Sequence, residues 1–173
     1  AQDAISDLVV GRAKKSNTIE YSGEGARRGY RQVRYVRPLS KYQVQMNEGV
    51  LPEQMNSMRL TNHRPDVEAR FDLILNNCKR GTNLSISDRE WLGMLKNRTV
   101  PMGANLPAPT LTTLPDDILH YKEPRILTVR ESARIQSFPD WFEFKGKYTT
   151  GGKRRRVECP RYTQVGNAVP PLL

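Results

Sequence analysis

Apolar residues recur at helical spacing between positions 66 and 78, at i, i+4, i+7, i+8 and i+11: Val67, Phe71, Ile74, Leu75 and Cys78. Pro65 precedes this stretch and Gly81 follows it, and both are typical signals for the start and stop of a helix. We therefore predict a helix over 66–78 with one buried apolar face. Because Cys78 lies on that face, we expect it to pack in the core rather than to act as a nucleophile.

A second helical pattern covers residues 86–97. Ser87 and Glu90 have the spacing of a capping box, and Ile86 is placed to pack against Trp91 as a hydrophobic staple. Gly93 weakens the pattern, since glycine is a poor helix former. We predict a second helix here.

The third helix is the best specified by local signals. Thr128 and Glu131 form a second potential capping box, and Pro139 ends the run that follows. Four aromatic residues then fall within seven positions: Phe138, Trp141, Phe142 and Phe144. Such a density beside a helix end predicts a packed corner of the structure.

The remaining segments favour irregular structure. Residues 1–9 fit a short helix, and residues 11–32, rich in Gly, Ser, Arg and Lys, fit a long exposed connector. Five prolines between 99 and 124 exclude a regular helix and predict an extended loop with room for short strands. Residues 146–162 have the composition of a polar loop, and Pro170 or Pro171 could begin a last helix.

The charge of the chain indicates the chemical class of its partners. The 173 residues, enough for one ordinary domain, carry 28 Lys and Arg against 18 Asp and Glu, a formal net charge of +10. Arginine outnumbers lysine 19 to 9, and its planar guanidinium pairs bidentately with phosphate oxygens or a guanine edge. This composition favours a nucleic acid as a partner.

Two basic stretches are candidates for contact with phosphate. In the first, Tyr30 and Tyr35 are interleaved with arginines, and a solvated linker is an equally open interpretation. The second is the run 153–156, which a solvated loop would also explain. The candidate nucleic-acid-binding residues are Arg31, Arg34, Arg37, Arg154, Arg155 and Arg156.

Familiar catalytic and metal-binding patterns are absent from the sequence. It contains no Gly-x-Ser-x-Gly, no phosphate-binding Gly-rich loop and no His-Glu-x-x-His. His63 and His120 stand alone, and Cys78 and Cys159 have neither a CxxC pattern nor a paired histidine, so we expect no metal site and no disulfide. No apolar run is long enough to span a membrane, and the amino terminus has no secretion signal. We expect an intracellular protein, in the cytoplasm or nucleoid of a bacterium or the nucleus of a eukaryote.

Two long motifs resemble those of one enzyme family. PRILTVRESARIQSFPD at 124–140 closely resembles the ninth conserved motif of the DNA cytosine-5 methyltransferases, and QVGNAVPPLL at 164–173 resembles the tenth. APTLTT at 108–113 looks like the loop that closes their target recognition domain, and AISDL at 4–8 is similar to the segment after their eighth motif. The order and spacing of all four segments agree with that family.

The resemblance implies an α+β fold with much irregular loop. It divides the chain into a connector at 1–35, a small target recognition domain at 36–144, and a basic loop with the tenth-motif segment at 145–173. That last segment would pack back onto a Rossmann-like catalytic domain absent from this chain. The sequence has no Pro-Cys-Gln, no Phe-x-Gly-x-Gly and no Glu-Asn-Val, so we expect no catalytic residue here and no activity from the chain alone.

The resemblance also implies roles for particular residues. Asn167 and Val169 would complete a pocket for S-adenosylmethionine that is formed mainly by the missing domain. From spacing alone, Gly166 and Asn167 would instead make an ordinary turn with positive φ. Arginines of the ninth motif would organise the recognition domain, with plain surface charge as the alternative. The structural residues that the resemblance assigns to the ninth motif are Arg125, Thr128, Arg130, Glu131 and Arg134, and those of the tenth motif are Gln164 and Gly166.

Together these features predict the DNA-recognition and carboxy-terminal part of a DNA cytosine-5 methyltransferase. That enzyme transfers a methyl group from S-adenosylmethionine to C5 of a flipped cytosine, and the partners would be duplex DNA and the amino-terminal catalytic domain or subunit. The alternative is a stand-alone basic DNA-binding module without enzymatic activity. A ribosomal-type RNA-binding protein is disfavoured by the long motifs and by Trp91 and Trp141, which we expect in packed contexts.

Overall fold

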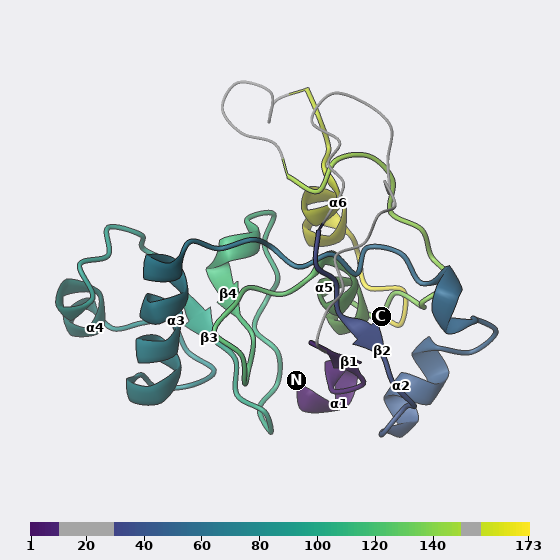
Figure 1. Ribbon diagram of the computed structural model, residues 1–173, viewed down its shortest axis with the longest axis horizontal. Coiled ribbons are helices and arrows are strands. Elements are labelled where there is room, and N and C mark those ends of the chain that lie inside the picture. Colours follow the sequence, from purple (N-terminus) through teal and green to yellow (C-terminus); the bar gives the residue numbers. More distant parts are fainter. Residues whose placement is uncertain (11–29, 150–156) are drawn as a thin grey trace.

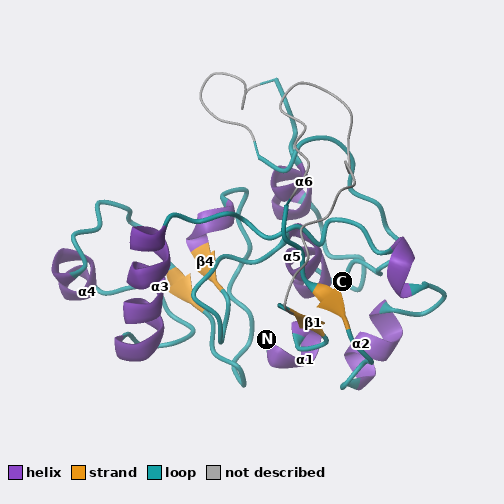
Figure 2. Cartoon of the chain, in the orientation of Figure 1, coloured by secondary structure: helices purple, strands orange, loops and turns teal. Residues whose placement is uncertain are grey.

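The computed structural model describes residues 1–10, 30–149 and 157–173. Short helices and very short strands alternate there with long loops (Figure 2), in agreement with an α+β chain rich in irregular structure. The helices are α1 (Gln2–Ile5), α2 (Lys41–Met46), α3 (Pro65–Asn77), α4 (Ile86–Trp91), α5 (Val129–Ile135) and α6 (Arg161–Asn167), with 3₁₀ turns at Pro52–Gln54 and Pro115–Asp117. The strands are β1 (Leu8–Val9), β2 (Arg34–Tyr35), β3 (Val100–Pro101) and β4 (Ile118–Leu119).

The helix α5 lies between two groups of elements (Figure 1). On one side are α3, α4 and the parallel pair of β3 and β4, and on the other are α1, α2 and the antiparallel pair of β1 and β2. The helix α6 packs on α5. Elements from both ends of the sequence therefore meet at α5.

Residues 30–35 form the middle of a narrow ribbon. Leu8 pairs with Tyr35 on one side, through β1 and β2. On the other side Val33 N donates to Met58 O at 3.0 Å and Leu60 N donates to Arg31 O at 2.8 Å. Side chains alternate between the two faces of such a ribbon. Its inner face is a small core of Leu8, Val33, Met55, Met58 and Leu60.

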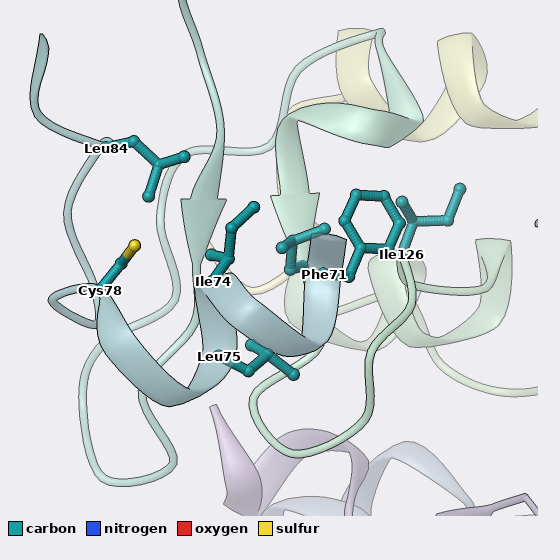
Figure 3. Packing of buried hydrophobic residues seen from close by; sticks show 7 residues of the cluster. Phe71, Ile74, Leu75, Cys78, Leu84 and Ile126 are labelled. Carbon is teal, nitrogen blue, oxygen red and sulfur yellow. The ribbon is translucent and has the colours of Figure 1, made fainter. Parts of the chain in front are cut away.

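The helix α3 confirms the prediction over 66–78. Pro65 occupies its first turn and Cys78 is its C-cap residue. Phe71 and Ile74 point toward β4 and Ile126, as Figure 3 shows, and Cys78 is buried in the same cluster. Packing in the core is thus the observed state of this cysteine.

The helix α4 begins and ends differently from the prediction. Its N-cap is Ser85, whose Oγ accepts from Asp88 N at 3.0 Å while Asp88 Oδ2 accepts from Ser85 N at 3.1 Å. The predicted capping box of Ser87 and Glu90 is therefore wrong. The helix ends at Trp91, whereas the prediction extended it to residue 97. Ile86 and Trp91 are both exposed, so the predicted staple is wrong. The predicted packing of Trp141 is wrong too, since its side chain is 62% exposed.

The predicted helix over 1–9 is too long. It ends at Ile5, and Leu8 and Val9 form β1, because the backbone there pairs with residues 34–36. The helix α2 was not predicted, although Ser40 and Gln43 form a capping box at its start. The helix α6 occupies part of the predicted polar loop and the predicted Gly-Asn turn. It ends at Asn167, and the last helix predicted to begin at Pro170 or Pro171 does not form.

Candidate functional site

The helix α5 begins with the predicted capping box. Thr128 Oγ1 accepts from Glu131 N at 3.1 Å, and Glu131 Oε2 accepts from Thr128 N at 2.7 Å. The helix ends at Gln136, before Pro139, because Ser137 adopts a left-handed conformation with φ 60°. Ser137 N donates to Arg134 O and Phe138 N donates to Ala133 O, which is the pairing of a Schellman motif.

Arg125 and Glu131 form a buried bidentate ion pair beside this capping box. Their Nη1–Oε2 and Nη2–Oε1 distances are 2.8 and 2.7 Å. Burial alone would raise the pKa of Glu131, but the charge and hydrogen bonds of Arg125 outweigh it and hold that pKa at about 2. Arg125 also pairs with Glu123 at 2.6 Å. The start of α5 is therefore held by ionised groups.

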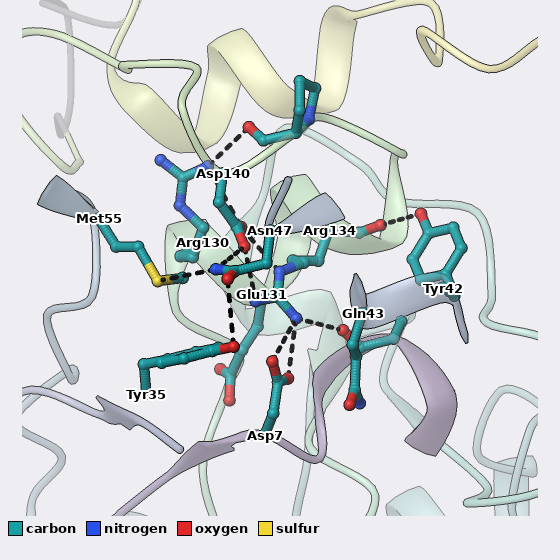
Figure 4. Close-up of polar contacts among 12 residues, drawn as sticks. Asp7, Tyr35, Tyr42, Gln43, Asn47, Met55, Arg130, Glu131, Arg134 and Asp140 are labelled. Atoms are coloured by element: carbon teal, nitrogen blue, oxygen red, sulfur yellow. Dashed lines mark hydrogen bonds and ion pairs between the residues drawn. The ribbon is translucent and has the colours of Figure 1, made fainter. Parts of the chain in front are cut away.

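Arg134 joins the amino-terminal segment to the segment that follows α5. Its Nε and Nη2 each donate to Asp140 at 2.7 Å, and its Nη1 lies 2.8 Å from Asp7 Oδ1 and 3.1 Å from Ala4 O. Figure 4 shows Arg134 between Asp7 and Asp140, with Asn47 also donating to Asp140. Arg134 and Asp7 have no exposed surface. This pairing fixes α1 and α2 against α5.

Arg130 points to a third set of partners. Its Nε and Nη2 donate to the backbone and side-chain oxygens of Asn56 at 3.1 and 2.8 Å, and Nη2 also donates to Phe142 O at 2.7 Å. Arg125, Arg130 and Arg134 are 8%, 0% and 0% exposed. Surface charge is therefore the wrong interpretation of these arginines.

The helix α6 packs beside this network. Arg161, which sequence reasoning missed, is buried and donates to Gly146 O at 2.9 Å and to Ser57 Oγ at 3.0 Å. Tyr162 Oη donates to Leu127 O at 2.6 Å. Gln164 Nε2 donates to Lys145 O and Cys159 O at 2.9 and 2.8 Å. A start after Pro160 was the available signal for this helix.

Gly166 is required by close packing and not by its φ angle. It lies within α6, so the predicted turn with positive φ is wrong. A Cβ atom at Gly166 would lie 2.4 Å from Thr112 O and 2.7 Å from Thr113 N. The loop at 111–113 therefore contacts the last turn of α6, which a residue larger than glycine would prevent.

The two predicted cofactor residues lie at the exposed end of α6. Asn167 is exposed, and its carboxamide forms no hydrogen bond to any described residue. Val169 is 72% exposed. The chain then turns back toward α5, where Leu172 N donates to Ser137 Oγ at 3.0 Å. This contact fixes the direction of the segment that carries both residues.

The structure places the predicted DNA-binding residues in two groups. Arg31, Arg34 and Arg37 are exposed on or beside the ribbon of residues 30–35. Arg154, Arg155 and Arg156 lie outside the described residues. The ninth-motif arginines are buried and do not belong to this exposed set.

Histidine protonation should make the fold sensitive to acid. Burial lowers the pKa of His120 from 6.5 to about 4, and its Nδ1 accepts from Glu123 N at 3.0 Å. Since the folded state excludes this proton, stability should fall as pH drops from about 6.5 to 4, by about 3 kcal/mol. Loss of the Glu131 charge adds to the fall between about 4.5 and 2. Chemical denaturation between pH 4 and 7.5 measures this slope.

The matched variant for that experiment is His120→Gln, which keeps an acceptor for the loop amides but cannot be protonated. It should flatten the slope between pH 6.5 and 4. The comparison variant is His63→Gln, because burial lowers the pKa of His63 as well. A slope in His120→Gln equal to that of the unmodified chain would show that His120 is not the titrating group.

Comparison with known proteins identifies the family. Residues 5–173 match the family model of the C-5 cytosine-specific DNA methylases, and the chain belongs to this family. Over 183 aligned positions, covering 99% of the chain, it is 36% identical to the type II methyltransferase M.DdeI of Desulfomicrobium norvegicum. Over 123 positions, covering 69% of the chain, it is 37% identical to the type II methyltransferase M.AquIB of a Picosynechococcus strain.

The chain spans different shares of these relatives. It covers 40% of M.DdeI but 85% of M.AquIB. Among solved structures, a prophage-encoded Escherichia coli protein assigned as a DNA modification methyltransferase matches 99% of the chain and 42% of its own length, with a TM-score of 0.52 and 21% identity. That structural likeness supports the fold alone.

None of the helices at 1–10, 30–149 and 157–173 is long and apolar enough to cross a membrane. In the same ranges no three His, Cys, Asp or Glu side chains are grouped so as to hold a metal ion.

Proposed function

We propose that this chain is the DNA-recognition and carboxy-terminal part of a DNA cytosine-5 methyltransferase. Residues 1–35 would connect it to the catalytic domain, 36–144 would form the target recognition domain, and 145–173 would return to the catalytic domain. The observation that carries the proposal is a family match over residues 5–173 in a sequence without Pro-Cys-Gln. The cysteine that attacks the base would then come from elsewhere in the enzyme.

S-adenosylmethionine supplies the methyl group when it is bound in this family's enzymes. Asn167 and Val169 fit one edge of such a site, because a free carboxamide and an exposed apolar side chain lie together at the end of α6. A small-molecule site is concave, and both residues are exposed here, so the remaining walls would come from the catalytic domain. In this chain Gly166 and Ser137 hold the edge in place.

DNA would be held by the exposed arginines. Arg31, Arg34 and Arg37 would contact backbone phosphates, together with Arg154–156 of the basic run. Methylation of C5 requires the cytosine to leave the base stack, which takes a few kcal/mol that protein contacts to the DNA offset. The buried ninth-motif arginines would keep this surface and the edge at Asn167 in fixed relation.

The share of each relative that the chain covers supports an enzyme in which the catalytic portion is a separate chain. The 123 residues aligned with M.AquIB make up 85% of that protein, so it is itself a short chain. The alignment with M.DdeI accounts for only 40% of a longer one. The test below uses a catalytic portion with Pro-Cys-Gln from the same source organism.

The test replaces Asn167 by alanine in the chain mixed with that catalytic portion. Loss of a buried hydrogen bond to the cofactor should weaken S-adenosylmethionine binding by about 1–3 kcal/mol, or about 5- to 150-fold. Affinity for duplex DNA should stay within twofold. Calorimetry with the cofactor and methyl transfer at saturating DNA measure both effects.

Two controls accompany this experiment. Asn76→Ala removes an equally exposed asparagine from α3 and should leave both affinities unchanged. The chain alone should give only background methyl incorporation. Incorporation by the chain alone that Cys78→Ser or Cys159→Ser abolishes would overturn the proposal, and DNA binding with no methyl transfer in any mixture would favour a stand-alone DNA-binding module.

A further inference from the structure

Four side chains stack alternately as aromatic ring and guanidinium. Arg59 Cζ lies 5.4 Å from the ring centre of Tyr30 and 5.2 Å from that of Tyr148, and Arg161 Cζ lies 4.7 Å from the Tyr148 ring. Tyr30 and Tyr148 are only 9% and 8% exposed. Arg59 therefore lies over two largely buried rings, and such contacts stabilise a cation through the ring faces.

The stack lies on the outer face of the ribbon. Gln32 and Arg59 are directly opposite each other in an antiparallel bridge. Val33 and Met58, whose side chains point the other way, are buried in the inner core. Because alternate residues share a face, Arg34 lies on the same outer face as Gln32 and Arg59. The outer face thus presents two guanidinium groups and a carboxamide.

Arg59 differs from the buried arginines in its hydrogen bonding. Arg125, Arg130, Arg134 and Arg161 all donate to carboxylates, hydroxyls or carbonyls. Across residues 1–10, 30–149 and 157–173, no hydrogen bond or ion pair engages the guanidinium of Arg59, which is half-buried. Its N–H donors are thus available to a ligand, while its contacts with the two rings restrict the side chain.

We propose that Arg59 binds a backbone phosphate of duplex DNA, with Gln32 and Arg34 beside it. This proposal rests on the proposed function and names a contact that the sequence did not suggest. A guanidinium donates to two phosphate oxygens at once. Since stacking has already restricted the side chain, little of its freedom remains to be lost on binding.

The test measures binding of the 173-residue chain to a labelled DNA duplex over a range of salt concentrations. In Arg59→Met an unbranched apolar chain stays between the rings while the charge is lost. Each phosphate contact contributes a slope of about −0.9 to log K against log salt. Arg59→Met should therefore reduce the slope by about 0.9 and weaken binding at low salt at least tenfold. Arg59→Lys should keep the slope.

Arg64→Met is the matched control, because Arg64 is exposed and already paired with Asp66 at 3.0 Å. It should change neither the slope nor the affinity appreciably. An unchanged slope in Arg59→Met, an equal change in Arg64→Met, or a loss confined to one base-pair sequence would overturn the assignment of Arg59 to a phosphate. If the unmodified chain does not bind duplex DNA at all, the proposed function fails together with this inference; if it binds and only Arg59→Met is silent, the inference fails alone.

Discussion

Replacement of Arg134 by methionine is expected to destabilise the chain by about 3–5 kcal/mol, because it leaves Asp7 and Asp140 buried without their cation. A domain of this size has a total stability of roughly 5–15 kcal/mol. The variant should therefore melt about 6–20 °C below the unmodified chain. Differential scanning calorimetry, with circular dichroism as a second probe, measures the difference.

The control for this prediction is Arg64→Met. The ion pair of Arg64 with Asp66 is exposed, with side chains 78% and 54% accessible, and such pairs contribute less than about 1 kcal/mol. The double variant Arg134→Met with Asp7→Asn should recover part of the loss, since one unpaired charge is removed with its partner. A melting temperature of Arg134→Met equal to that of Arg64→Met would show that the buried network does not hold the fold together.

Replacement of Gly166 by alanine is expected to disturb both the stability of the chain and the position of Asn167. Its Cβ would lie 2.4 Å from Thr112 O, and a backbone atom cannot move aside as a side chain can. Either α6 or the loop at 111–113 must shift, which should destabilise the chain by about 1–3 kcal/mol. The shift would also displace Asn167. Thermal melting measures the first effect, and cofactor binding in the mixture with the catalytic portion measures the second.

Gly103→Ala is the matched substitution. The nearest atom to a Cβ at Gly103 is Leu106 Cδ1, at the flexible end of a side chain that is 44% exposed. This variant should lose less than about 1 kcal/mol and keep cofactor binding. If Gly166→Ala melts and binds as the unmodified chain does, the close approach to Thr112 is not a constraint on α6.

Local signals were sufficient for α3 and for the start of α5. The apolar period of α3, with Pro65 ahead of it, and the capping box of Thr128 and Glu131 depend only on residues a few positions apart. The motifs at 124–140 and 164–173 likewise indicated the family, which the match over 5–173 bears out. Local signals misled at α4, where the predicted cap was Ser87 and the observed cap is Ser85.

Burial and pairing between distant segments were decided only by the tertiary structure. The sequence could not tell that Arg134 lies between Asp7 and Asp140, or that Arg59 stacks between Tyr30 and Tyr148. The same holds for Gly166, whose neighbour Thr112 is 54 positions away in the sequence. By itself the sequence determined the family, the positive charge and the helices with strong local caps. Which arginines are buried and which face solvent depends on contacts between distant segments that form only when the chain folds. An arginine has the same charge whether or not a carboxylate lies beside it in the fold, so the sequence does not reveal its partner.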